Sequence, residues 1–302
     1  MRRGVAILLV IASAACFGTV GVLTLLAYEH GARPLPILAW RFAIAAAVMA
    51  GYLALVRPTA LRIGSGDLGR FALLSVTGYG AASLCFFFAL QHASASIVAV
   101  LLYTYPALIV AVEAVVARRW PSRAAVAGIA LTFAGCALVV GVLEQDLRVD
   151  ATGIVLALGA GVAYAMFTML SDRLVPGRSR IVVMTYMFGI SAVVMTSIAL
   201  VFGESLSPGG WEPVLWWLLL AIVAVPTIMA VVLYMGGIRR LGPARAALAS
   251  TTEPVFTIAL SWLVLGERLT GLQVLGAVLV VGGIALAERS ATRADGSPVL
   301  LI

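Results

Sequence analysis

Lysine is absent from this chain of 302 residues, and only 11 % of its side chains are charged. Soluble domains have about 25 % charged and about 45–50 % apolar residues, whereas 63 % of this chain is hydrophobic. A soluble fold of this length has no interior large enough to hide that much apolar surface. The composition therefore excludes a soluble protein and predicts an integral membrane protein.

Residues that carry catalytic and metal chemistry are also scarce. The only two histidines, His30 and His92, fall at the ends of apolar runs, and the chain has no HExxH motif, GxSxG motif or paired-carboxylate metal set. An intramembrane hydrolase would need a serine or a metal together with a histidine inside a helix. We therefore expect no enzyme, no metal and no cofactor. The three cysteines lie inside apolar runs without metal spacing, which favours buried free thiols over a disulfide.

The net charge of +7 comes from arginines that stand in pairs and triplets between apolar runs, a pattern that argues against nucleic-acid binding. A helix that crosses a bilayer needs about 20 apolar residues. The first run resembles a secretory signal up to Cys16, but it continues through Leu26, so we predict an uncleaved helix. The ten predicted spans are 4–28, 34–56, 69–91, 95–117, 122–143, 152–172, 180–203, 213–236, 244–266 and 270–288.

The positions of the arginines predict the orientation of these spans. Arg33, Arg41, Arg148 and Arg268 would lie on one side of the membrane, and the other 16 of the 20 arginines on the opposite side. The positive-inside rule places the arginine-rich side, with both termini, in the cytoplasm. The expected location is the inner membrane of a bacterium. Arg41 lies about six residues from the outer end of its span, and we expect it to snorkel to that surface.

The chain repeats itself at a shift of 148 residues, which places Pro106 on Pro254 and Gly135 on Gly283. Each half contains five spans, and an odd number of spans forces the second copy to insert upside down, as in many secondary transporters. We therefore predict an all-α membrane protein built from two inverted five-helix repeats. The predicted units are 1–146, 147–288 and a short cytoplasmic tail at 289–302.

Helix-breaking residues recur at matching depths in the two halves. Pro106 and Pro254 lie about ten residues into their spans, near the bilayer midplane at about 1.5 Å per residue, and Gly78 aligns with Pro226. A proline frees a backbone carbonyl, which is costly in hydrocarbon unless protein or water satisfies it. Breakers at corresponding positions are a sequence signature of a transporter's binding site. The alternative is a set of packing kinks with no solute nearby.

Polar side chains at similar depth are hydroxyls, phenols and one carboxylate. They can hydrogen-bond an α-amino and an α-carboxylate group while aromatic faces pack against a side chain, which suits a small zwitterion. Each tyrosine taken alone could equally be a packing residue. The expected pathway residues are Thr77, Tyr79, Tyr103, Tyr105, Tyr164, Thr168, Ser250, Thr251 and Glu253.

Two acidic residues are singled out. An ionised acid at the bilayer centre costs about 2.5–3.5 kcal/mol on insertion scales, so Glu253 must face protein or water. Three roles are open for it: binding the solute's ammonium group, carrying a proton that couples export to the pH gradient, or capping free backbone near Pro254. Glu113 is a candidate inner gate because it lies five residues before Arg118; the alternative is an interfacial acid.

Two stretches, FFFALQHASASIVAVLLYTYPALIV (86–110) and EPVFTIALSWLVLGERLTGLQVLGAVLVVGGI (253–284), resemble the EamA-type transporters of the drug/metabolite transporter superfamily. The resemblance covers residues 4–288 and is greatest to ten-helix exporters of aromatic and other neutral amino acids, of the YddG type. The first half departs from the second, because Tyr105 stands where the second half has Glu253.

The resemblance implies a secondary transporter that exports neutral or aromatic amino acids by alternating access around a central cavity. We expect it to act as a monomer, with a small-molecule cargo and the lipid bilayer as partners and no nucleic acid. A drug or other metabolite exporter is the alternative within the superfamily. A channel and, more distantly, an intramembrane enzyme are the alternatives outside it.

Overall fold

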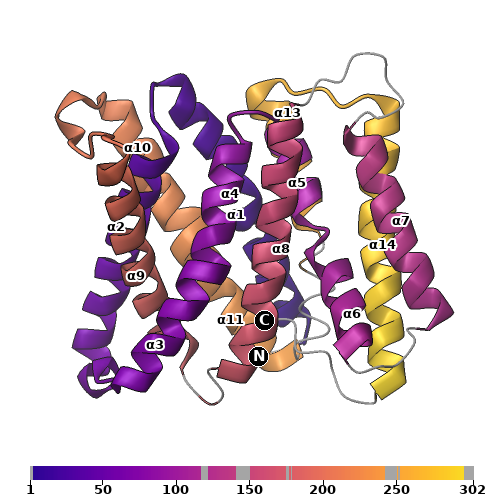
Figure 1. Ribbon diagram of the computed structural model, residues 1–302, viewed down its shortest axis with the longest axis horizontal. Helices are drawn as coiled ribbons and strands as arrows, with labels where there is room; N and C mark the ends of the chain where they lie inside the picture. The colour runs from indigo at the N-terminus through magenta and orange to yellow at the C-terminus, as the bar shows by residue number, and fades with distance from the viewer. Residues whose placement is uncertain are drawn as a thin grey trace.

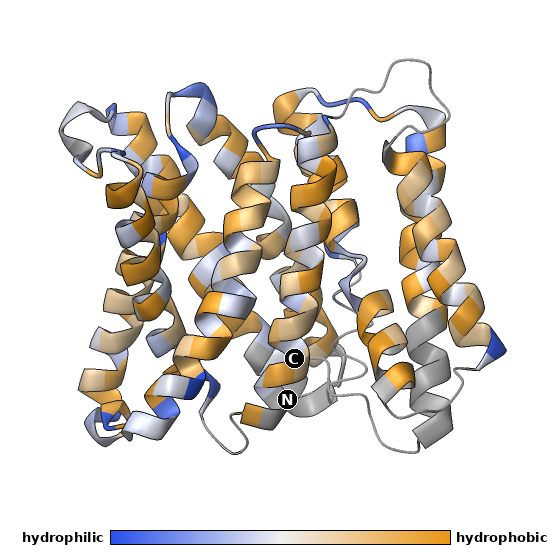
Figure 2. Ribbon diagram, viewed as in Figure 1, coloured by the Kyte–Doolittle hydropathy of each residue, from blue (hydrophilic) through white to orange (hydrophobic). Residues whose placement is uncertain are grey.

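In the computed structural model, every regular element among the described residues is a helix. The structure describes residues 3–116, 122–140, 150–174, 177, 179–241, 250 and 252–295. The helices stand side by side across the molecule (Figure 1), with apolar residues along their lengths and the most polar residues gathered near their ends (Figure 2). This distribution is that of a helical membrane protein.

The two halves of the chain contribute similar sets of helices. The first half contains α1 (Arg3–Glu29), α2 (Pro34–Val56), α3 (Ser65–Leu74), α4 (Gly80–Ala89), α5 (Ala95–Leu102), α6 (Tyr105–Val116) and α7 (Arg123–Val140). The second half contains α8 (Ala151–Leu174), α9 (Arg180–Val201), α10 (Pro213–Ile222), α11 (Ala230–Leu241), α13 (Glu253–Leu265) and α14 (Gly271–Asp295). Within the described residues, six helical segments of 21–26 residues are long and apolar enough to cross a membrane, and four apolar helical segments are shorter.

Wide π-helical turns interrupt corresponding helices of the two halves. The turn η2 (Ser75–Tyr79) joins α3 to α4, and η4 (Val223–Met229) joins α10 to α11. The two turns begin 148 residues apart, since 223 − 75 = 148. Gly78 lies in η2 and Pro226 in η4, so these two predicted breakers lie in the irregular turns.

The second pair of predicted breakers interrupts the chain more completely than expected. α5 ends at Leu102 and α6 begins at Tyr105, so Pro106 is the second residue of a new helix. Pro254 is likewise the second residue of α13, and the starts of α6 and α13 are again 148 residues apart (253 − 105). The expectation of a proline inside one continuous helix was wrong, because a proline is favourable in the first turn, where its missing N–H has no partner to lose. α6 lies in the lower part of the molecule and α13 in the upper part (Figure 1).

Helices α7 and α14 pack through glycines. A Cβ atom on Gly135 would lie 2.5 Å from the carbonyl oxygen of Gly276, and one on Gly276 would lie 2.6 Å from the carbonyl oxygen of Gly135. The two backbones can approach this closely only because neither residue has a side chain. Among the described residues of these two helices, none lines the cavity described below.

Replacing Gly135 with leucine is expected to separate α7 from α14 and to lower the free energy of unfolding by about 1–3 kcal/mol, the usual cost of overpacking a close interface. Thermal unfolding of the purified protein in detergent measures this change. Gly282→Leu is the matched control on α14, because no atom lies within 4 Å of a Cβ built there. Equal losses of stability in both variants would contradict the interpretation.

One end of the bundle is held by contacts between the halves, and we call it the capped end. Glu267, which follows α13, accepts hydrogen bonds from the backbone N–H groups of Ala95 (2.9 Å) and Ser96 (3.3 Å) and from the Ser96 hydroxyl (2.7 Å). Asp150, which precedes α8, lies 3.0 Å from Nδ1 of His92. The backbone N–H of Thr152 and the neighbouring His92 lower the pKa of Asp150. Both contacts hold the turn between α4 and α5.

Candidate functional site

A cavity of about 150 Å³ lies among residues of both halves, where the helices are interrupted. Six of the nine predicted pathway residues line it: Tyr79, Tyr103, Tyr105, Tyr164, Ser250 and Glu253. Pro226 of the π turn η4 also contributes to the wall. The helix breaks and the polar residues predicted from the sequence therefore meet around one space.

Three other predicted residues are placed differently or lie outside the described part. Thr77 and Thr168 do not line the cavity. The hydroxyl of Thr77 donates to the carbonyl of Leu73 (2.8 Å) and that of Thr168 to the carbonyl of Tyr164 (2.9 Å), each one helical turn back. Threonine hydroxyls often satisfy themselves in this way inside helices. Thr251 and the side chain of Glu113 lie outside the described residues.

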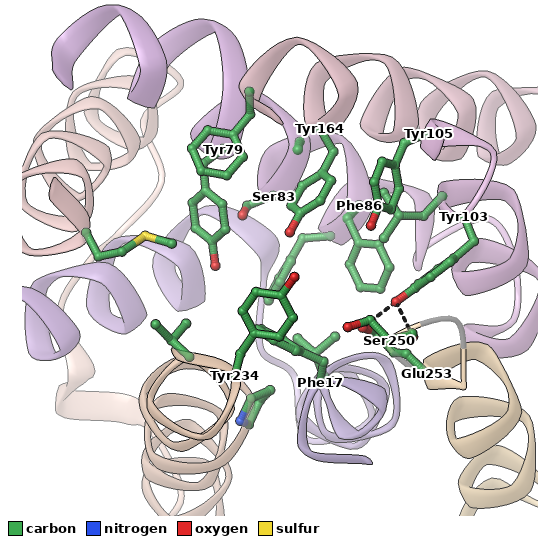
Figure 3. A pocket seen from close by; sticks show the side chains of 18 of the residues that line it. Phe17, Tyr79, Ser83, Phe86, Tyr103, Tyr105, Tyr164, Tyr234, Ser250 and Glu253 are labelled. Atoms are coloured by element: carbon green, nitrogen blue, oxygen red, sulfur yellow. Dashed lines mark hydrogen bonds between the residues drawn. The ribbon is translucent and has the colours of Figure 1, made fainter. Parts of the chain in front are cut away.

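Four tyrosines and a phenylalanine form a continuous row along one wall of the cavity. Successive ring centroids lie 5.6 Å apart for Tyr103 and Tyr105, 4.8 Å for Tyr105 and Tyr164, 5.7 Å for Tyr164 and Phe167, and 5.7 Å for Phe167 and Tyr79. Such edge-on and tilted contacts hold each ring in place. The hydroxyl groups of Tyr79 and Tyr164 point into the space between the helices (Figure 3), and among the residues described neither has a hydrogen-bond partner.

Two glycines bring α8 close enough to complete this wall. A Cβ atom on Gly78 would lie 2.7 Å from Cβ of Phe167, so only glycine lets η2 close onto α8 there. A Cβ atom on Gly161 of α8 would lie 3.1 Å from the carbonyl oxygen of Leu102 and 3.0 Å from the Thr104 hydroxyl oxygen. The broken segment between α5 and α6 therefore rests directly on the backbone of α8.

Glu253 begins α13 and contacts the opposite half of the chain through Tyr103. The Tyr103 hydroxyl oxygen lies 2.6 Å from Oε2 of Glu253 and 3.1 Å from the carbonyl oxygen of Ser250 (Figure 3). The Ser250 carbonyl lies four residues before Pro254, which has no N–H to donate to it, and a phenol from the first half contacts this carbonyl. Tyr103 therefore contacts both Glu253 and a backbone carbonyl near Pro254, and the three roles that were open for Glu253 stay predictions.

The contacts of Tyr103 present one proton to two acceptors. A phenol donates one hydrogen bond, so an ionised Glu253 and the Ser250 carbonyl would compete for it. If Glu253 is protonated, its own hydroxyl donates to Tyr103 and Tyr103 donates to Ser250, which satisfies all three groups. The geometry is therefore that of a carboxyl group able to hold a proton.

Several residues that line the cavity were not predicted from the sequence, and the prediction for Arg41 was wrong. Arg41 does not snorkel: it is 4 % exposed and lines the cavity. The sequence feature that could have predicted the burial of Arg41 is its position well inside an apolar run. Tyr234 of α11 and Phe17 of α1 also line the cavity, as do Arg180 and Met184 of α9. Of these four residues, none was among the predicted pathway residues. Phe17 and Met184 resemble any apolar residue of a membrane helix, which left no signal for them.

A helical membrane bundle in which two repeats break their helices around a shared polar cavity has the architecture of a transporter. The chain belongs to the EamA-like transporter family, whose model matches residues 4–141 and again residues 151–288. The family assignment and the two-repeat architecture are thus confirmed. A solved crystal structure has the same fold, with a TM-score of 0.67 and 21 % sequence identity over 97 % of this chain and all of that one.

Curated relatives agree with this assignment. The uncharacterized transporter YcbK of Bacillus subtilis is 28 % identical over 86 % of this chain and 85 % of its own length. YwfM of the same organism is 25 % identical over 94 % of both chains, and an uncharacterized transporter of Archaeoglobus fulgidus is 26 % identical over 79 % of this chain and 83 % of its own. These names point to transport and to no enzymatic activity.

Proposed function

We propose that this protein is a secondary transporter that exports small neutral or aromatic amino acids. Ten membrane spans form two inverted repeats, with both termini in the cytoplasm of a bacterium, and a monomer carries out transport. The observation that carries the proposal is the cavity of about 150 Å³, which is lined by phenols from both repeats and lies beside the helix breaks. A cavity of this size holds a molecule about as large as benzene, which suits an aromatic side chain or a small amino acid.

The breaks in the helices support alternating access around this cavity. In the first repeat α5 ends at Leu102 and α6 begins at Tyr105, and in the second repeat α13 begins at the corresponding residue, Glu253. At such breaks the two half-helices can rotate relative to each other without breaking the hydrogen bonds inside either one. In this structure the contacts of the capped end keep the two halves together on the side that we propose faces out of the cell.

A flux assay in proteoliposomes tests the cargo. We expect some neutral or aromatic amino acids to exchange across the membrane with a rate that saturates as their concentration rises, as a carrier requires and a simple channel does not. A panel of the proteinogenic amino acids, each with and without a pH gradient, measures substrate choice and proton coupling together. If no amino acid exchanges while the protein is folded and inserted, the proposed cargo is wrong.

The two phenols without a hydrogen-bond partner, Tyr79 and Tyr164, are expected to influence substrate choice. Replacing each with phenylalanine keeps the aromatic row but removes a hydroxyl that the cargo's ammonium group can contact. The apparent affinity for the preferred amino acid should fall about three- to tenfold, as expected for one hydrogen bond of about 0.5–1.5 kcal/mol. Tyr52→Phe is the control, because Tyr52 is exposed on α2 and does not line the cavity. Unchanged competition profiles would remove the two phenols from the binding site.

A further inference from the structure

Arg41 of α2 is a buried cation on the cavity wall. Its Nε donates to the hydroxyl oxygen of Thr227 at 2.8 Å. Within the part of the chain that the structure describes, no carboxylate pairs with Arg41, and no hydrogen-bond acceptor meets its Nη1 and Nη2 groups. A buried charge without a partner is strongly unfavourable. The cavity therefore contains a cationic group whose acceptor must come from elsewhere.

The guanidinium group is held in one place by three neighbours. Its central carbon lies 5.3 Å from the ring centroids of both Phe42 and Phe87. Thr227 lies in the wide turn η4 and accepts the hydrogen bond from Nε. Its hydroxyl donates in turn to the carbonyl of Ile222 at 2.8 Å, five residues back at the end of α10. A guanidinium has five N–H donors, and Nε uses one. Four donors thus remain on a fixed, planar group, an arrangement that matches the two oxygens of a carboxylate.

The charges around the cavity favour the same kind of ligand. Among the described residues that line the cavity, Arg41 and Arg180 are the cations and Glu253 is the carboxylate. Glu253 already accepts a hydrogen bond from Tyr103. The described lining residues therefore have a net positive charge whether or not Glu253 is ionised, and a solute with a carboxylate would balance it.

The position of Arg41 sets the direction in which a cargo would lie. Arg41 is seven residues beyond Pro34, the first residue of α2, or about 10 Å along the helix. The Tyr79 ring packs against Phe42, with centroids 6.0 Å apart. A carboxylate bound at Arg41 would leave the rest of the solute beside Tyr79 and the aromatic row.

We propose that Arg41 recognises the carboxylate group of the transported solute through a bidentate hydrogen bond, and that Thr227 orients it. The proposal rests on the proposed function and makes it more specific, because it requires a carboxylate on the cargo. An arginine that only tied α2 to η4 would need no ligand and would not discriminate between an acid and its amide.

Competition experiments on the wild-type protein test the proposal without any substitution. The probe is exchange of labelled L-phenylalanine in proteoliposomes, with L-phenylalanine, L-phenylalaninamide, 3-phenylpropionate and inorganic phosphate as competitors. We expect the amide, which lacks the carboxylate, to compete about tenfold or more weakly than the acid, the factor that one charge-assisted hydrogen bond contributes. Equal competition by acid and amide would overturn the proposal. Competition by phosphate as strong as that of L-phenylalanine would overturn the choice of a carboxylate.

Two variants locate the effect at Arg41. In Arg41→Gln we expect L-phenylalanine and its amide to compete within about twofold of each other. Arg41→Lys should recover part of the preference for the acid over the amide, because lysine keeps the charge but lacks the planar guanidinium group. Arg33→Gln is the matched control: it removes an exposed charge just before the same helix and should keep the wild-type preference. An Arg41→Gln protein that binds L-phenylalanine and still prefers the acid would contradict the assignment.

Thermal stabilisation in detergent separates failure of this proposal from failure of the proposed function. If 3-phenylpropionate or L-phenylalanine stabilises the wild-type protein, and the amide does not, the carboxylate site stands even when no amino acid is transported. If amino acids are transported and the amide stabilises as well as the acid, the transport function stands and the carboxylate site is wrong. If no carboxylate stabilises the wild-type protein and none is transported, both are wrong.

Discussion

Replacing Glu253 with glutamine is expected to uncouple transport from the pH gradient while leaving the protein folded. The glutamine amide can donate to the Tyr103 oxygen, and Tyr103 then donates to the Ser250 carbonyl, which reproduces the arrangement with a protonated carboxyl group. The variant cannot release a proton. Net flux driven by a pH gradient should fall about tenfold or more, because the lost step is the uptake and release of a proton by the carboxyl group at position 253.

Exchange and net flux must be measured side by side in the same proteoliposomes. Exchange of labelled for unlabelled amino acid needs no net proton movement, so Glu253→Gln should retain it to within about threefold. Glu212→Gln is the control, because Glu212 is an exposed residue just before α10. Full pH-driven flux in Glu253→Gln would remove Glu253 from coupling. Loss of exchange and net flux together would instead assign Glu253 to cargo binding.

Tyr103→Phe separates the structural part of this contact from the functional part. It leaves the Ser250 carbonyl and Glu253 without their shared donor. Both the thermal stability and the coupled flux should therefore fall in Tyr103→Phe, whereas only the flux should fall in Glu253→Gln.

Much of the fold was predictable because the residues that mark the repeat are prolines and glycines, which have strong backbone preferences. Proline and glycine restrict or free the backbone wherever they occur, so Pro106 and Pro254 mark equivalent breaks without any knowledge of packing. Whether a proline kinks a helix or begins one depends on the three residues before it. Tyr103 and Thr104 form a turn in the structure, and neither residue type indicates one.

The contacts that complete the site were not predictable, because each joins residues far apart in the sequence. Arg41 is buried because the π turn η4 places Thr227 beside it, 186 residues away. Glu267 lies in one of the two stretches that resemble EamA-type transporters, but that resemblance does not name its partners. These are backbone groups of α5, 171 and 172 residues away in the sequence. Hydropathy and periodicity describe one helix at a time and say nothing about such pairs.

Replacing Glu267 with alanine is expected to loosen the capped end and to expose the cavity from that side. The carboxylate of Glu267 satisfies two backbone N–H groups at the start of α5 and the Ser96 hydroxyl, and an anion there also interacts favourably with the positive end of the helix. Loss of such a cap costs about 1–2 kcal/mol. If the Glu267 contacts form only when this end is closed, their loss shifts the open–closed equilibrium toward the open state by about 5- to 30-fold.

Labelling of a cysteine in the cavity measures this shift. Ser83→Cys, in a background without the three native cysteines, places a thiol on the cavity wall, and a membrane-impermeant maleimide added to intact cells reports access from outside. The labelling rate should rise about fivefold or more with Glu267→Ala and less with Glu267→Gln, which keeps an acceptor oxygen. Glu29→Ala, at the end of α1, removes an exposed carboxylate and should leave labelling unchanged. A loss of thermal stability without faster labelling would show that Glu267 only caps α5, since a gate must alter access as well as stability.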